Sequence, residues 1–213
     1  MIRKIKSYCE EVISEFEEIP SSRKALLEKL AAHINFKLQS GMPVNLVYIC
    51  THNSRRSHFG QIWAKAAADY FDVPRVYTFS GGTEATSFNR NAINALIRAG
   101  FLVNSVSADK NAVYQVMYDT ARTPVECFSK VYDHPANPHQ DFVAIMTCGE
   151  AEENCPFIPG AELRIATTYD DPKAFDNTPL QDAKYDERCR QIARETMYVF
   201  SCVDSNQPAS REC

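Results

Sequence analysis

The strongest constraint on the fold is the alternation of short apolar segments with amphipathic ones after residue 43. The apolar segments have the length and composition of buried strands, and they are NLVYIC (45–50), RVYTFS (75–80), FVAIMTC (142–148) and LRIATTY (163–169). Helical periodicity is found at 57–71, 89–99 and 185–203, and Gly100 is placed to end the second of these helices. Strands that alternate with helices predict an α/β fold, namely an open parallel sheet flanked by helices.

Further segments outside this alternation define the predicted domain organisation. Residues 1–43 show helical periodicity on both sides of Pro20, which predicts an N-terminal helical hairpin extension. Its apolar stripe would pack on the main domain, 44–203, or on a second copy of the chain, which would make a homodimer. Residues from about 105 to 140 read as two β segments around a turn, so a β-hairpin insertion is expected there. Residues 204–213 are expected to form a loose tail.

The charge balance and hydropathy of the chain restrict its partners and its location. With 23 basic and 27 acidic residues among 213, the formal net charge is −4, so no basic field points to nucleic acid or to an anionic membrane. No apolar run is long enough to span a bilayer, and the first residues lack the pattern of a secretory signal. We therefore expect a cytoplasmic protein that binds neither nucleic acid nor a membrane.

The chain has eight cysteines. In a reducing compartment such thiols are structural, catalytic or metal-binding. No Cys-x-x-Cys pair occurs, and Cys148 and Cys155 are too far apart in sequence for a zinc knuckle, so we expect no metal site and no bound cofactor. The cysteines to which no chemistry is assigned are Cys9, Cys127, Cys189, Cys202 and Cys213.

The most informative stretch is CTHNSRRS, residues 50–57, which joins the first predicted strand to the helix after it. In open α/β sheets ligands lie beyond the carboxyl ends of the strands, and Cys50 is at such an end. The loop N–H groups and the helix start favour an anion there, and the same field favours a reactive thiolate. Arg56 offers a planar set of donors for an oxyanion, and Ser57 is placed to bond the Cys50 thiolate. The alternative is a buried cysteine beside solvated arginines, since the Cys-x5-Arg spacing alone is weak.

VYICTHNSRRS resembles the phosphate loop of the low-molecular-weight protein tyrosine phosphatase superfamily, whose pattern Cys-x-x-Asn-Ser-x-Arg-Ser is met at every fixed position. The resemblance covers about residues 44–104 and 140–203. It implies that Cys50 is the nucleophile and that Asp171, in YDDPKAF, is the general acid that protonates the leaving oxygen. By itself, Asp-Asp-Pro is equally typical of a simple turn. The oxyanion-binding residues that the resemblance implies are Thr51, His52, Asn53, Ser54, Arg55, Arg56 and Ser57.

A second motif, MTCGEAEENCPFIPG, resembles the redox segment of thioredoxin-coupled arsenate reductases. The resemblance implies a thiol relay in which Cys50 attacks arsenate and Cys148 then attacks the Cys50 sulfur, which releases arsenite. Cys155 would then form a disulfide with Cys148, and thioredoxin or a similar thiol reductant would reduce it. Gly149 and Gly160 border the segment and would let it bend. The acidic residues between the two cysteines argue against a buried segment.

The sequence departs from these reductases in several places. Arg55 replaces a cysteine that they often carry, His52 replaces a glycine, and Gln61 replaces a glutamate that helps some of them to hold potassium. A second hypothesis is a protein tyrosine phosphatase or aryl phosphatase, which needs only Cys50, Arg56 and Asp171 and works through a phosphocysteine intermediate. A third is a redox-sensing or oxyanion-binding protein without turnover, in which Asp171 would be dispensable. The aromatic residues expected to pack rather than to contact substrate are Trp63, Phe157 and Tyr169.

Overall fold

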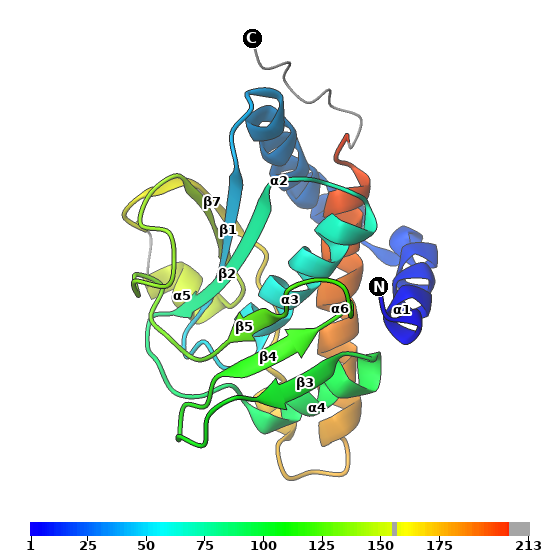
Figure 1. Cartoon of the computed structure of the whole chain (residues 1–213), viewed down its shortest axis with the longest axis vertical. Helices are drawn as coiled ribbons and strands as arrows, with labels where there is room; N and C mark the ends of the chain where they lie inside the picture. Colours follow the sequence, from blue (N-terminus) through cyan, green and yellow to red (C-terminus); the bar gives the residue numbers. More distant parts are fainter. Residues whose placement is uncertain (155–156, 205–213) are drawn as a thin grey trace.

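A four-stranded parallel sheet lies at the centre of the molecule (Figure 1). The computed structural model describes residues 1–154 and 157–204. The strand order is β2-β1-β6-β7, and the strands are β1 (Val44–Cys50), β2 (Val76–Gly82), β6 (Phe142–Met146) and β7 (Ala161–Ala166). The helices of the main domain are α3 (Arg56–Tyr70), α4 (Arg90–Ala99), α5 (Gly149–Asn154) and α6 (Gln181–Ser201), and α4 packs on α6 and β3. The predicted fold class is confirmed.

The sheet is buried on both faces, which is why its central strands read as continuous apolar runs. In β1 only Asn45 is less than fully buried, and all of β6 is buried. Leu46 and Tyr48 belong to the larger core cluster, while Val47 and Ile49, which point to the opposite face, belong to a smaller one that also includes Cys50 at the end of the strand. The carboxyl end of β1 is therefore held between two packed layers.

The predicted boundaries of α4 are confirmed by its caps. The Asn89 side chain accepts hydrogen bonds from the backbone N–H groups of Asn91 and Ala92. Gly100 ends the helix in the left-handed conformation, with φ of 118°, which is the usual role of a glycine at this position.

The N-terminal residues form two helices, α1 (Arg3–Ser14) and α2 (Ser21–Gln39), joined by the short 3-10 helix η1 (Phe16–Glu18). Both pack on α6; α1 also contacts α4, and α2 also contacts β1. The side chains of Ile5, Cys9 and Ile34 are buried in the same core cluster as the main sheet. Of the two surfaces predicted to cover the apolar stripe, the main domain of the same chain is the one observed.

The insertion differs from the predicted β-hairpin because it has a third strand. Its antiparallel sheet has the order β3-β4-β5, with β3 (Leu102–Ser105), β4 (Tyr114–Met117) and β5 (Val125–Cys127). β3 was missed because most of its side chains are exposed, so it carries no apolar alternation. After β5 the chain returns to the main sheet, where Val131 forms a parallel bridge with Gly82 at the end of β2.

No helix within the described residues is both long and apolar enough to cross a membrane. Of the predicted tail, only Asp204 is described, and the rest lies outside the described residues.

Candidate active site

Cys50 is the last residue of β1, and the loop that follows it leads directly into α3. Its side chain is buried, and the sulfur lies 3.1 Å from the hydroxyl oxygen of Ser57. This is the contact that the sequence predicted. A hydroxyl at this distance can donate to a thiolate and so favour the reactive form of the cysteine.

In the loop between Cys50 and α3, backbone carbonyls accept hydrogen bonds from neighbouring segments, whereas backbone N–H groups are available to a ligand. The carbonyl oxygens of Cys50 and Thr51 accept from the backbone N–H groups of Thr83 and Glu84, and the Ser54 carbonyl accepts from Asn89. By contrast, the backbone N–H groups of residues 51–55 donate no hydrogen bond to any part of the chain that the structure describes. Open N–H groups beside the start of a helix form a concavity suited to an anion.

Asn53 orients the loop from inside. It is fully buried and has a φ of 43°, a left-handed conformation that asparagine tolerates better than most residues. Its amide nitrogen donates to the Ser57 hydroxyl at 2.9 Å, and its amide oxygen accepts from the Lys130 backbone N–H at 2.9 Å. The Asn53 side chain thus holds Ser57 in place. The part that Lys130 plays had no signal in the sequence, because it lies in the insertion, 77 residues away.

Arg56 and Asp171 meet at the side of the loop. The Arg56 guanidinium donates to an Asp171 carboxylate oxygen at 2.6 Å and to the Tyr169 carbonyl at 2.8 Å. The other Asp171 carboxylate oxygen caps the 3-10 helix η2 (Pro172–Phe175) by accepting from the Lys173 N–H at 3.0 Å. Asp171 therefore both makes a turn and faces the loop, so the two interpretations of Asp-Asp-Pro are compatible.

The remaining loop side chains point to different neighbours. Arg55 donates to the Tyr185 hydroxyl at 2.8 Å, and the Ser54 hydroxyl donates to the Ser87 carbonyl at 2.8 Å. His52 is half-buried and lies 3.6 Å from the Glu84 carboxylate. These three side chains are held at the edge of the loop.

Cys148 lies next to the Cys50 loop. It follows β6, the strand paired with β1, and its sulfur is 3.4 Å from the Thr51 hydroxyl oxygen. Cys50 and Cys148 are both buried in the smaller core cluster, so the expectation that the cysteine segment is unburied is wrong for Cys148. A thiol at a strand end packs as a small apolar group while the acidic residues after it face solvent. Cys155 lies outside the described residues.

The segment after Cys148 forms the short helix α5, which Arg164 of β7 contacts at two points. Its guanidinium donates to the Glu152 carboxylate at 3.0 Å and to the Glu152 carbonyl at 2.5 Å. Gly160 has a φ of 80°, and a Cβ there would meet the His139 carbonyl, so a glycine is needed. Phe157 is 76% exposed, which contradicts the expectation that it packs.

Burial makes several other cysteines unreactive. It raises the pKa of each of the Cys9, Cys127 and Cys189 thiols to about 12. These thiols are therefore protonated at neutral pH. Trp63 and Tyr169 are buried as expected. Over residues 1–154 and 157–204, no cluster of histidine, cysteine or acidic side chains has the arrangement of a metal site.

Comparisons with known proteins agree with this picture. No protein-family model matches the chain. The curated arsenate reductases of Bacillus licheniformis and Bacillus subtilis are each 26% identical to it, over 157 and 156 residues, which are 73% of this chain and 94% of either relative. A low-molecular-weight phosphotyrosine phosphatase from Vibrio cholerae O395 superposes with a TM-score of 0.51 at 10% identity, covering 74% of this chain and 95% of that one. The structural likeness shows a shared fold, and the sequence likeness spans nearly the full length of the relatives.

Proposed function

Because the chain belongs to the low-molecular-weight protein tyrosine phosphatase superfamily, we propose that it reduces arsenate to arsenite by a relay of three thiols. The observation that carries the proposal is the position of Cys148, whose sulfur lies 3.4 Å from the hydroxyl of Thr51, the residue after Cys50. Hydrolysis of a phosphate ester needs one thiol, whereas reduction needs a second thiol within reach of the first. The relatives named arsenate reductases support the same reaction.

In the first step, the Cys50 thiolate attacks arsenate held by the loop N–H groups and by Arg56. A sulfur–arsenic bond forms, one arsenic–oxygen bond breaks, and the leaving oxygen takes a proton from Asp171 and departs as water. The ion pair of Arg56 with Asp171, at 2.6 Å, keeps both groups beside the loop. An incoming oxyanion would accept from the same guanidinium.

In the second step, the Cys148 thiolate attacks the Cys50 sulfur. A disulfide forms, the sulfur–arsenic bond breaks, and its electron pair stays on arsenic, which leaves as arsenite. Cys155 then attacks the Cys148 sulfur, so the disulfide moves to Cys148–Cys155 and Cys50 departs as a thiolate. A dithiol reductant of the thioredoxin type would reduce that disulfide and close the cycle.

The test is a single turnover on fully reduced protein. Arsenate is added without an external reductant, arsenite is quantified, and disulfides are mapped by mass spectrometry. We expect about one arsenite per chain and a Cys148–Cys155 disulfide, because one chain holds two electrons for the reaction. Cys148→Ser should release no arsenite. Cys202→Ser, a control at a half-buried cysteine outside the relay, should release the wild-type amount.

The competing function would give a different result in the same experiment. A phosphatase acting on phosphotyrosine or an aryl phosphate would hydrolyse its substrate through Cys50, with Arg56 and Asp171, but would yield neither arsenite nor a disulfide. That outcome would reject the relay and leave Cys148 as a core residue.

A further inference from the structure

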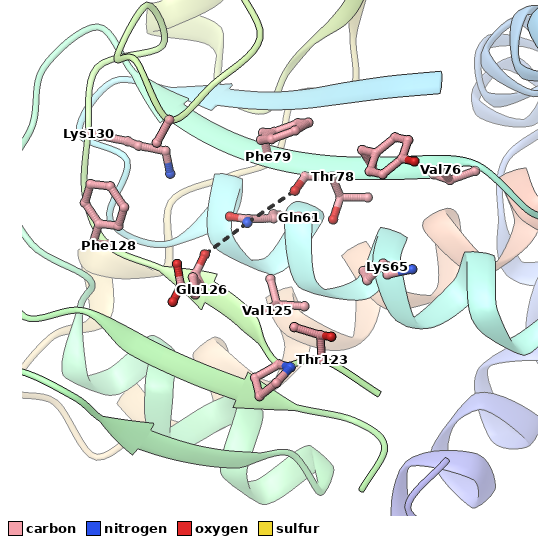
Figure 2. Close-up of a pocket in the computed structure, with 13 residues that line it drawn as sticks. Gln61, Lys65, Val76, Thr78, Phe79, Thr123, Val125, Glu126, Phe128 and Lys130 are labelled. Carbon is pink, nitrogen blue, oxygen red and sulfur yellow. Dashed lines mark hydrogen bonds between the residues drawn. The ribbon is translucent and has the colours of Figure 1, made fainter. Parts of the chain in front are cut away.

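A pocket lies between the main sheet and the small sheet of the insertion. Its walls come from β2, α3 and residues 123–130, and its volume is about 480 Å³. β2 and β5 are edge strands of their sheets, and the pocket lies between those two edges (Figure 2). This volume is within the range of small-molecule sites.

The pocket is mainly apolar and is bridged on one side by Gln61. Its apolar surface includes Val76, Phe79, Val125 and Phe128. The Gln61 amide donates to the carbonyls of Thr78 in β2 and Glu126 in β5, at 3.4 and 3.3 Å, so it links the two strand edges. An apolar cavity with a few fixed polar groups is what an organic ligand requires.

Lys130 supplies the pocket with a buried positive charge. Its side chain is only 4% exposed, yet within the described residues its amino group makes no ion pair and no hydrogen bond. The amino nitrogen lies over the ring of Phe128, 4.5 Å from the ring centre. In Figure 2 the amino group points into the pocket. Burying an unpaired charge is costly, so this group favours an anionic partner.

The neighbouring titratable groups do not supply that anion. Burial, with the nearby Lys130 charge, lowers the pKa of His58 to about 3, and burial raises that of Cys127 to about 12, so both are neutral at pH 7. Lys65, the other cation of the pocket, is paired with Asp69 at 2.9 Å. Glu126 is exposed and makes no salt bridge with Lys130.

We propose that this pocket binds a small organic anion, one carboxylate on an aromatic or similarly apolar body, with Lys130 as its counterion. The apolar lining takes the body of the ligand, and the Lys130 ammonium takes its charge. Inorganic oxyanions lack the apolar part and are better served by the N–H groups of the Cys50 loop. The proposal does not depend on the function proposed for that loop.

The test compares 2-naphthoate with 2-naphthamide, which has the same shape and no charge. Binding is measured by calorimetry on the whole reduced chain, with excess inorganic phosphate to occupy the Cys50 loop. We expect naphthoate to bind at least about tenfold more tightly than naphthamide at pH 7, as for one partly desolvated ion pair. Burial lowers the pKa of Lys130 to about 8. Because the anion favours the charged lysine, binding near pH 8.5 should take up protons, which the buffer dependence of the heat reveals.

Two variants test whether Lys130 is the residue whose charge binds the carboxylate. Lys130→Met should abolish both the preference for naphthoate and the proton uptake. Lys65→Met, a matched change at the paired lysine of the same pocket, should keep both. Amide NMR spectra of each variant would verify that it keeps the wild-type fold. Equal affinity for the two probes, no binding of either, displacement of naphthoate by phosphate, or a preference that survives Lys130→Met would each overturn the proposal.

Discussion

Ser57 is the residue through which the loop acts most directly on the thiol of Cys50. Its hydroxyl lies 3.1 Å from the sulfur and accepts from the Asn53 amide at 2.9 Å. Because that amide fills the acceptor side of the hydroxyl, the hydroxyl hydrogen is free to point at the sulfur. Reactivity at Cys50 therefore depends on a short chain of side chains fixed by the fold.

Replacing Ser57 with alanine should make Cys50 a poorer nucleophile. A hydrogen bond to a charged group contributes about 1.5–3 kcal/mol, so we expect the alkylation rate of Cys50 at pH 7 to fall about 10- to 100-fold. The rate is measured with iodoacetamide and mass spectrometry. Ser54→Ala is the matched control, because the Ser54 hydroxyl donates to the Ser87 carbonyl and not to the thiol. An equal fall in the alkylation rate of both variants would mean that a disturbed loop, and not the lost Ser57 hydroxyl, causes the fall.

Replacing Asp171 with asparagine tests the proposed general acid. The loss of a positioned proton donor should slow turnover about 10²- to 10⁴-fold for a substrate whose leaving group needs a proton. The measurement compares phenyl phosphate with p-nitrophenyl phosphate, and the loss should be smaller for the better leaving group, p-nitrophenolate. Asp170→Asn, at a neighbouring exposed carboxylate, should leave both rates unchanged. A uniform loss on the two substrates would instead assign Asp171 to holding Arg56.

At the scale of elements, α5 stands between the two cysteines of the proposed relay. It is six residues long, so its ends are about 9 Å apart while it stays helical. A disulfide needs Cα atoms within about 7 Å of each other. The last step of the relay thus requires α5 to unwind, and the contacts of Arg164 with Glu152 oppose that change.

Arg164→Ala should therefore speed the formation of the Cys148–Cys155 disulfide. Loss of a partly exposed ion pair and one hydrogen bond is worth about 1 kcal/mol, which corresponds to a rate increase of about fivefold. The rate is followed by quenching single turnovers with an alkylating agent. Glu153→Ala is the control, since Glu153 is an exposed residue of the same helix. An unchanged or slower rate after Arg164→Ala would show that unwinding of α5 does not limit this step.

At the scale of the whole molecule, the N-terminal helices are part of the core. Trp63 of α3 stacks on Tyr8 of α1, with ring centres 5.2 Å apart, and meets Phe101 edge-on. Arg190 of α6 forms an ion pair with Glu15, just after α1. The predicted boundary between 1–43 and 44–203 therefore separates two sequence patterns and not two hydrophobic cores, because both segments bury side chains in the same core cluster.

Ile5→Ala should destabilise the entire chain. The Ile5 side chain is fully buried, and such truncations lower the free energy of unfolding by about 2–5 kcal/mol. In Ile5→Ala, the midpoints of urea unfolding measured by circular dichroism and by Trp63 fluorescence should both move to lower urea concentration. Lys6→Ala, a change at an exposed neighbour, should move neither midpoint. Unfolding of the first helices in a separate transition, with the main transition unmoved, would contradict a shared core. The predicted homodimer is tested separately, by the mass of the chain in solution.

The sequence by itself determined the elements of the main sheet and the loop at Cys50. These depend on neighbours in the chain: apolar runs that bury both faces, Asn89 and Gly100 that cap a helix, and a cysteine at a strand end directly before a helix start. Ser57 was predicted in the same way, because it lies at the start of the helix that follows the Cys50 loop. The exposed strand β3 was missed, since pairing with β4 and not its own pattern defines it.

Only the tertiary structure decided how distant residues contact that loop, including Asp171 and Cys148, which the resemblance had implied. Asp171 reaches Arg56 across 115 residues, Cys148 reaches Thr51 across 97, and the Lys130 backbone reaches Asn53 across 77. Parallel strands bring their carboxyl ends to one edge of the sheet, but periodicity does not encode the order in which they pair. That order places Cys148 beside the loop and leaves β2 at the sheet edge that lines the Lys130 pocket.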